Sequence, residues 1–179
     1  MKRTILISSL VVLIAGAIAA VTYLGWLSPD YAGVAGKPIE NTRLVDFAGA
    51  DRSFEELRGR GAVVYFWASW CSPCKVTMAK LKDLPANDKL RKRFVIVALD
   101  DEIQAVKDAQ ARTGYAGQSW IATVGIPLIQ RKFAGNDKRA VPYVVELDAQ
   151  GTIVGRSYGL DGKAQLLSVL AGTSKLSGD

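Results

Sequence analysis

The sequence contains no histidine and only two cysteines. Structural zinc sites usually have four cysteine or histidine ligands, so this chain cannot complete such a site by itself. Two cysteines also do not indicate a small scaffold held together by several disulfides. The net charge is +6, of which Lys2 and Arg3 supply two, and the remaining +4 is mild, which argues against dedicated nucleic-acid binding.

The two cysteines, Cys71 and Cys74, form a Cys-x-x-Cys motif. The motif follows an apolar run at residues 62–67 and precedes a helix-like stretch at 74–84, which predicts a strand, a tight turn and the start of a helix. A helix N-terminus offers unpaired N–H groups and the positive end of the helix dipole, and both favour a thiolate. We therefore expect Cys71 to be the attacking sulfur and to be partly exposed.

Cys74 is expected to lie one turn further into the helix. Cys74, Met78 and Leu81 recur at i, i+4 and i+7, so Cys74 shares the helix face that should pack on the sheet. This spacing predicts that Cys74 is the buried, resolving thiol. A purely structural disulfide is the alternative, but a bridge across four residues stabilises the fold by only about 2 kcal/mol. A Cys-x-x-Cys motif near a β-α pattern favours redox chemistry.

The run Phe66-Trp67-Ala68-x-Trp70-Cys71-x-Pro73-Cys74 resembles the thioredoxin superfamily and, within it, the membrane-anchored TlpA/ResA-like thiol–disulfide oxidoreductases. The resemblance covers roughly residues 37–172. It implies an α/β fold, namely a thioredoxin-like three-layer sandwich with a central mixed β-sheet. It also implies dithiol–disulfide exchange as the activity, with no metal and no cofactor other than a redox-active Cys71–Cys74 disulfide.

The N-terminal residues 5–27 contain no charged side chain and follow the basic start Lys2-Arg3. As a helix this run would reach roughly 34 Å, enough to span a hydrocarbon core of about 30 Å. We predict one N-terminal transmembrane helix, an uncleaved anchor over residues 1–27. A cleaved signal peptide is the alternative, because residues 17–19 fit a small-x-small cleavage site.

Both interpretations of the N-terminus lead to the same location. The basic residues keep the N-terminus in the cytoplasm, so the rest of the chain lies on the periplasmic, extracytoplasmic side of the cell (inner) membrane. Residues 28–38 are rich in proline and glycine and are expected to be a linker. We expect residues 39–172 to form a single thioredoxin-like domain and residues 173–179 to form a flexible tail.

Within the domain, periodicity and turn residues predict the following elements. Strands are expected at 43–47, 94–99, 143–147 and 152–158, and helices at 102–113 and 162–170, with Gly114 ending the first of these helices. A capping box formed by Ser53 and Glu56 is expected to open a short helix. Residues 128–133 are expected to form one or two helical turns, and residues 115–127 are either a short strand or a loop.

Pro142 lies directly before the predicted strand at 143–147. An ordinary trans-proline is tolerated at the start of a strand. In the resembling family the matching proline is cis and lies against the cysteine pair, and its position before the final hairpin makes Pro142 that match. The resemblance then implies that Val141 offers its backbone to an extended substrate segment, while Trp70 forms an apolar lip and Pro73 shapes the turn.

Two positions at which thioredoxin-like proteins often carry an acid hold other residues here. The strand before the motif has Tyr65, and the third position after the second cysteine has Thr77. Glu146 is the one acid inside an otherwise apolar predicted strand. Two interpretations of Glu146 stay open: it lies beneath Cys74 and takes the proton of that thiol, or it occupies a solvent-facing edge position.

The resemblance implies a reductant for disulfide-containing extracytoplasmic proteins, such as apocytochromes c during cytochrome c maturation or copper-site assembly proteins. A DsbD/CcdA-type membrane reductase would supply the electrons. A disulfide oxidase or isomerase is the alternative, because direction depends on reduction potential. Pro73 in the second x position is thioredoxin-like and favours reduction. A Sco-type metallochaperone would need a distal histidine, and a peroxiredoxin would need a Pro-x-x-x-Thr run close to Cys71; both features are missing.

Overall fold

A computed structural model of the 179-residue chain describes residues 14, 16, 33–84, 92–100 and 102–176. The chain divides into two units at Gly33 and Val34, and the fold described below belongs to the second unit. Over the described residues, no helix combines the length and the apolar character needed to cross a membrane. The predicted anchor at residues 1–27 lies outside the described residues apart from Ile14 and Gly16, which are both helical.

The described residues build a mixed seven-stranded sheet in the order β2-β1-β5-β4-β3-β6-β7. Its strands are β1 (Leu44–Asp46), β2 (Asp51–Arg52), β3 (Ala62–Trp67), β4 (Phe94–Ala98), β5 (Gln118–Ala122), β6 (Tyr143–Leu147) and β7 (Ile153–Ser157). Strands β3, β4 and β5 are parallel, whereas β1 and β6 run antiparallel to their neighbours in this group. The C-terminal ends of β3, β4 and β5 and the N-terminal end of β6 therefore lie on the same side of the sheet.

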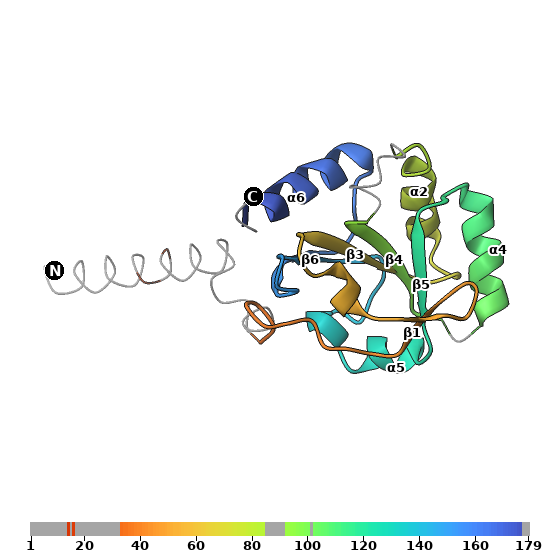
Figure 1. Ribbon diagram of the computed structural model, residues 1–179, viewed down its shortest axis with the longest axis horizontal. Coiled ribbons are helices and arrows are strands. Elements are labelled where there is room, and N and C mark those ends of the chain that lie inside the picture. Colours follow the sequence, from red (N-terminus) through yellow and green to blue (C-terminus); the bar gives the residue numbers. More distant parts are fainter. Residues whose placement is uncertain (1–13, 15, 17–32, 85–91, 101, 177–179) are drawn as a thin grey trace, which may run out of the picture. The chain divides into compact units, whose positions relative to one another are not determined.

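Helices cover both faces of the sheet (Figure 1). On one side lie α2 (Ser72–Lys80), α4 (Ile103–Thr113) and α6 (Lys163–Leu176), and on the other lie η1 (Phe54–Leu57), α5 (Gly125–Gln130) and η2 (Phe133–Gly135). Because both faces are covered, every residue of β3 and β4 is buried, which explains why these strands are continuous apolar runs. The predicted α/β class with a central mixed sheet is confirmed.

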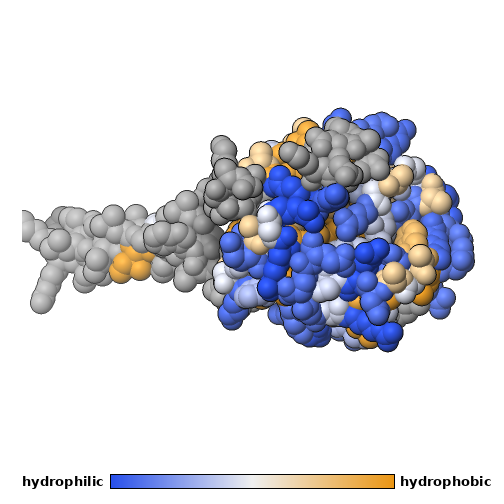
Figure 2. All heavy atoms as spheres, viewed as in Figure 1, coloured by the Kyte–Doolittle hydropathy of each residue, from blue (hydrophilic) through white to orange (hydrophobic). Residues whose placement is uncertain are grey.

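Alternate residues of β3 contribute to two different cores. Tyr65 and Trp67 join a cluster that includes Met78 of α2 and Leu166 of α6. Phe66 points to the other face, where its ring contacts those of the 3-10 helices and of Tyr143 in β6. The face of the molecule shown in Figure 2 is mostly hydrophilic, as expected when these large apolar residues are inside.

Several local predictions are confirmed. The capping box is present, since the Ser53 hydroxyl accepts the Glu55 N–H at 3.2 Å and the Glu56 carboxylate accepts the Ser53 N–H at 3.0 Å. The helix that follows is a single 3-10 turn. Helix α4 ends at Gly114 in the left-handed conformation (φ 72°), which glycine adopts without a steric cost. Residues 115–127, for which either a short strand or a loop was expected, contain strand β5 and the start of α5.

Other boundaries differ from the predictions. Helix α2 begins at Ser72 and ends at Lys80 rather than spanning 74–84, because Cys71 caps its start and the Leu81 N–H turns back to the Met78 and Thr77 carbonyls. Strand β2 was not predicted, since a two-residue strand of charged side chains has no apolar pattern. Helix α6 continues to Leu176, past the predicted helix end at residue 170 and into the predicted tail.

The folded domain also starts before residue 39. The Gly36 N–H donates to the Ile153 carbonyl at 3.0 Å, and the Ile153 N–H donates to the Lys37 carbonyl at 2.9 Å. Pro38 forms an isolated bridge with Thr152. The last residues of the predicted linker are therefore paired with the beginning of β7. This pairing covers part of the outer edge of the sheet.

Gly125, at the start of α5, allows this helix to approach the end of β4. A methyl group on Gly125 would lie 2.3 Å from the Leu99 carbonyl carbon and 2.4 Å from the Asp100 nitrogen. Because backbone atoms cannot rotate away, Gly125→Ala should lower the free energy of unfolding by about 1–3 kcal/mol. Urea denaturation measures this loss.

Gly172→Ala is the matched control, because a methyl group at this helical position meets no heavy atom within 4 Å. Alanine is the better helix former, so this variant should be neutral or slightly more stable. An equal loss of stability in both variants would contradict the close approach at Gly125.

Candidate active site

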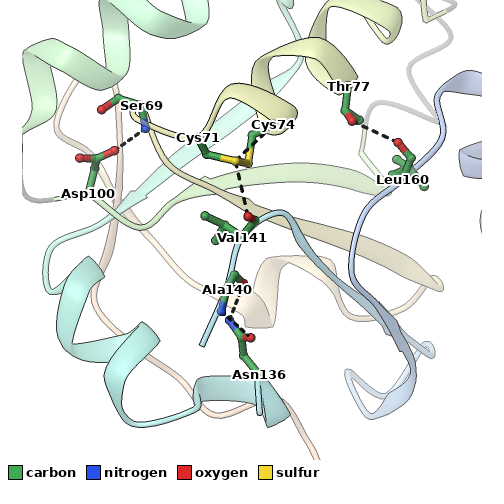
Figure 3. The surroundings of a disulfide bond; sticks show 9 residues. All are labelled: Ser69, Cys71, Cys74, Thr77, Asp100, Asn136, Ala140, Val141 and Leu160. Carbon is green, nitrogen blue, oxygen red and sulfur yellow. Dashed lines mark hydrogen bonds between the residues drawn. A yellow bond between two sulfur atoms is a disulfide. The ribbon is translucent and has the colours of Figure 1, made fainter. Parts of the chain in front are cut away.

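Cys71 and Cys74 form a disulfide at the start of α2 (Figure 3). Cys71 is the N-cap residue, and its sulfur accepts the Cys74 N–H at 3.2 Å. Pro73 lies in the first turn, where the missing N–H of proline costs no helical hydrogen bond. The predicted position of Cys71 at a helix N-terminus is confirmed, and a thiolate there would be stabilised by the helix dipole.

Both cysteines are buried. Cys74 is 0% exposed, as its helix spacing predicted, and Cys71 is 4% exposed. The expected partial exposure of Cys71 is wrong for the disulfide state, because the disulfide holds this residue between α2 and the segment before β6. Trp70, the residue that precedes Cys71 in the sequence, is 57% exposed and lies outside the core.

The segment before β6 contacts the disulfide. The peptide bond between Val141 and Pro142 is cis, and the Val141 carbonyl oxygen lies 3.6 Å from the Cys71 sulfur (Figure 3). A disulfide sulfur carries no proton, so this carbonyl can accept a hydrogen bond from Cys71 only after reduction to the thiol. Both Val141 and Pro142 are half-buried, and no described residue accepts the Val141 N–H.

Asp100 fixes the approach to the motif from the side of β4. It is 7% exposed, and its carboxylate accepts the Ser69 N–H (Figure 3). Ser69 lies two residues before Cys71, so this hydrogen bond holds the chain that leads from β3 into α2. Sequence reasoning did not identify Asp100. The available signal was an acid placed directly after the apolar run at 94–99.

Asn136 is a second buried polar residue near the site that the sequence analysis missed. It is 2% exposed, and its side chain bonds both backbone groups of Ala140. Ala140 immediately precedes Val141. An asparagine in a stretch of glycine and charged residues indicates only a turn, so no sequence signal separated Asn136 from an ordinary loop residue.

A family model described as a thioredoxin-like domain matches residues 52–173. The chain belongs to the thioredoxin-like family. It is 28% identical over 177 residues to a protein named thiol-disulfide oxidoreductase ResA from Bacillus thuringiensis (strain Al Hakam), and the alignment covers 93% of this chain and 95% of that protein. The predicted resemblance to ResA-like proteins is thereby confirmed.

Solved structures share the fold. One is a putative protein disulfide isomerase from Bacteroides thetaiotaomicron, with a TM-score of 0.63 and 20% identity over 81% of this chain and 91% of that chain. Another is a putative thiol:disulfide interchange protein DsbE from Chlorobium tepidum, with a TM-score of 0.60 and 22% identity over 76% of this chain and 97% of that chain. At these identities the structures establish the thioredoxin-like fold alone.

The two positions that often carry an acid in thioredoxin-like proteins are neighbours, with Tyr65 on β3 and Thr77 on α2. Burial raises the pKa of Tyr65 to about 12, and the nearby Thr77 hydroxyl lowers it by a smaller amount. Thr77 donates its own proton to the Leu160 carbonyl at 3.2 Å (Figure 3), while the Tyr65 hydroxyl makes no hydrogen bond to a described residue. A neutral phenol therefore occupies the place of a buried acid, and it cannot accept the proton of a thiol.

Glu146 lies on β6, opposite Val63 of β3 on one side and Gly155 of β7 on the other. Its carboxylate packs over Gly155, where an added methyl group would be 2.6 Å from the carboxyl carbon. Val63 precedes Trp67, the last residue of β3, by four positions, which is roughly 13 Å along the strand. The Glu146 carboxylate thus contacts β7, away from the Cys-x-x-Cys motif. Proton transfer from Cys74 to Glu146 stays a prediction.

The alternative interpretation of Glu146 needs correction. Strand β6 is not an edge strand, because β7 pairs with it on the outer side. The Glu146 side chain is half-buried, and burial raises the pKa of its carboxyl group. The odd acid of this strand is therefore a partly desolvated group inside the sheet rather than a freely solvated one.

The raised pKa of Glu146 makes a prediction about stability. A group whose pKa is higher in the folded than in the unfolded state stabilises the fold fully below its unfolded pKa, and this contribution is lost as the pH rises through the folded pKa. Glutamine does not ionise, so the free energy of unfolding of Glu146→Gln relative to wild type should increase from about pH 4 upward and then level off. Denaturation at a series of pH values measures the difference.

Glu102→Gln is the matched control, because Glu102 is an exposed carboxylate that makes no capping hydrogen bond. It should lack this gain, and an equal gain in both variants would contradict the burial argument. Glu146→Gln also tests proton transfer separately. An unchanged pH profile of disulfide reduction in this variant would exclude Glu146 as the acceptor of the Cys74 proton.

Proposed function

We propose that this chain is a thiol–disulfide oxidoreductase that reduces disulfides in extracytoplasmic partner proteins through Cys71 and Cys74. The observation that carries the proposal is the disulfide at the N-terminus of α2, in contact with the Val141 carbonyl (Figure 3). Membership of the thioredoxin-like family and the name of the ResA relative support the same activity.

The reaction begins with the reduced chain. The Cys71 thiolate attacks one sulfur of the partner disulfide, a bond forms between Cys71 and that sulfur, and the partner's other sulfur leaves as a thiolate. The Cys74 thiolate then attacks the Cys71 sulfur, which forms the Cys71–Cys74 disulfide and releases the second partner thiolate. Two electrons pass to the partner, and its two thiolates take up protons from solvent.

The order of attack follows from the positions of the two sulfurs. Cys71 caps the helix and receives the Cys74 N–H, so its thiolate is favoured by a hydrogen bond and by the helix dipole. Cys74 lies in the first turn of α2 and is fully buried. Of the two cysteines, Cys71 is the one that directly follows the exposed Trp70, so the proposed partner approaches the pair from that side.

The partner is expected to bind as an extended segment. The Val141 N–H has no acceptor among the described residues, and its carbonyl points at Cys71, so both groups are available for strand-like pairing next to the reacting sulfur. Pro142 holds the chain at this point, and the exposed Trp70 ring supplies an apolar contact on the other side of the motif.

The proposed location rests on the sequence. The uncharged run at 5–27 behind Lys2-Arg3 favours a single-pass anchor with the catalytic domain outside the cytoplasm. In that compartment a dithiol needs an external source of electrons, and a DsbD/CcdA-type membrane reductase is the proposed donor. Apocytochromes c and copper-site assembly proteins are the proposed substrates.

Single-cysteine variants test the assignment of the nucleophile. Cys71→Ser should lower insulin-disulfide reduction to the uncatalysed rate, because the attacking sulfur is gone. Cys74→Ser should still attack but should not release its partner, so a mixed disulfide through Cys71 accumulates and its partner can be identified by mass spectrometry. The double variant is the control for trapping, and residual turnover by Cys71→Ser would contradict the assignment.

The direction of the reaction is tested by the reduction potential of the Cys71–Cys74 pair. Thioredoxin, a reductant, lies at about −270 mV and DsbA, an oxidant, at about −120 mV. Because proline at the position of Pro73 is typical of thioredoxin, we expect the reduction potential of the pair to lie nearer that of thioredoxin. Equilibration of the purified chain with glutathione redox buffers measures it, and a value near that of DsbA would instead support the oxidase alternative.

A further inference from the structure

We propose that Asn136 is a positioning residue for disulfide exchange, which holds the Ala140–Val141 backbone in place for a protein substrate. The inference rests on the proposed function, because the positioned group acts on a substrate segment bound beside Cys71. It assigns a role to a buried side chain that does not itself touch the disulfide. The role is to keep the Val141 peptide groups in register with the reacting sulfur.

The geometry around Asn136 is specific. Its amide nitrogen donates to the Ala140 carbonyl at 2.9 Å, and its amide oxygen accepts the Ala140 N–H at 3.2 Å (Figure 3). One side chain thus binds both backbone groups of a single residue, as a neighbouring strand would. The two bonds fix the peptide planes on either side of Ala140, and the second of these planes includes the Val141 nitrogen. The next carbonyl along the chain is the one 3.6 Å from the Cys71 sulfur.

The chain around Asn136 needs such support, because its backbone is unusual. Lys132, Ala134 and Arg139 have φ values of 58°, 51° and 51°, in the left-handed region that residues other than glycine rarely adopt. Residues in such conformations persist only where surrounding contacts hold them, and they are concentrated at functional sites. This stretch leads directly into Val141 and Pro142.

Residues of β6 and β7, together with Tyr158 just after β7, hold the first part of this stretch. The Tyr143 hydroxyl donates to the Ala134 carbonyl at 2.7 Å, and the Tyr158 hydroxyl accepts the Lys138 N–H at 2.9 Å. The Arg156 guanidinium binds the Asp137 carboxylate. These anchors end at residue 138. Within the described part of the chain, Asn136 is the one side chain that hydrogen-bonds to Ala140, so it extends the anchored framework to the substrate-binding groups.

A positioning role and a purely structural role make different predictions. If Asn136 only stabilised a turn, its loss would affect the whole fold, or it would affect all disulfide substrates equally. If it positions the Val141 peptide groups, its loss should matter only for substrates that pair with the backbone. A small aromatic disulfide can react with Cys71 without that pairing.

The experiment compares two substrates in the full chain. Asn136→Ala should lower kcat/KM for insulin-disulfide reduction by about ten- to a hundredfold, mainly through KM, because the peptide groups beside the sulfur are displaced. The rates of two other reactions should change by less than about twofold, because Cys71 remains the N-cap residue of α2. These reactions are the reduction of 5,5′-dithiobis(2-nitrobenzoate) and the alkylation of the reduced Cys71 thiol by iodoacetamide. Asn41→Ala is the matched control, because Asn41 accepts one exposed hydrogen bond from Ser53 outside the site.

Asn136→Asp keeps the shape of the side chain, and it tests the positioning role if the alanine variant does not fold. An ionised carboxylate cannot donate to the Ala140 carbonyl, whereas a protonated carboxyl group has both a donor and an acceptor. Insulin reduction by this variant, expressed relative to wild type, should therefore recover as the pH falls from about 8 to about 5. A ratio that stays flat with pH would contradict the positioning role.

The outcomes separate this inference from the function on which it rests. Loss of insulin reduction with retained reaction of the small disulfide supports the positioning role. Equal loss for both substrates, or loss for neither, overturns it while the proposed function stands. If the wild-type chain reduces neither substrate, the proposed function fails, and the role of Asn136 fails with it.

Discussion

The site depends on the pairing of β3 with β6. β3 lies between β4 and β6 and is buried on both faces, and Phe66 near its end is opposite Tyr143 at the start of β6. The chain that leaves β3 therefore emerges beside the chain that enters β6. This antiparallel register brings the Cys71 sulfur within 3.6 Å of the Val141 carbonyl, although the two residues are 70 positions apart.

The environment of the disulfide is largely neutral on its inner side. Cys74 is buried in a cluster with Tyr65, a phenol with a raised pKa, and Thr77 directs its proton to a carbonyl. The carboxylate of Glu146 packs on β7. The difference between the two sulfurs thus comes mainly from their places in α2, since Cys71 lies at the positive end of the helix and Cys74 one turn inside it.

Polar contacts on the outer side determine where the two chain segments run. Asp100 holds the segment before α2 through the Ser69 N–H, and Asn136 holds the segment before Val141 through Ala140. Each contact joins a buried side chain to a backbone group, and an unpaired buried group would cost free energy. The disulfide therefore lies between two segments with fixed backbones, and such supporting contacts keep a site in one geometry.

Local features could be predicted because short-range physics decides them. The apolar run of β3, the capping box at Ser53, the left-handed end of α4 at Gly114 and the N-terminal position of Cys71 all depend on neighbours within a few residues. The resemblance around the cysteine motif also led to Pro142, which lies far from the motif in the sequence and is cis. The burial of Cys74 followed from helix periodicity.

What only the tertiary structure decided depends on contacts between segments far apart in the sequence. Asp100 and Ser69 are 31 positions apart, and the burial of Cys71 comes from the segment before β6. Asn136 binds a residue only four positions away, but the loop that carries it is held by Tyr143 of β6 and Arg156 of β7. The sequence by itself determined which sulfur caps a helix, because that is a local property. The backbone groups that meet this sulfur were decided by the sheet, because strand register places them there.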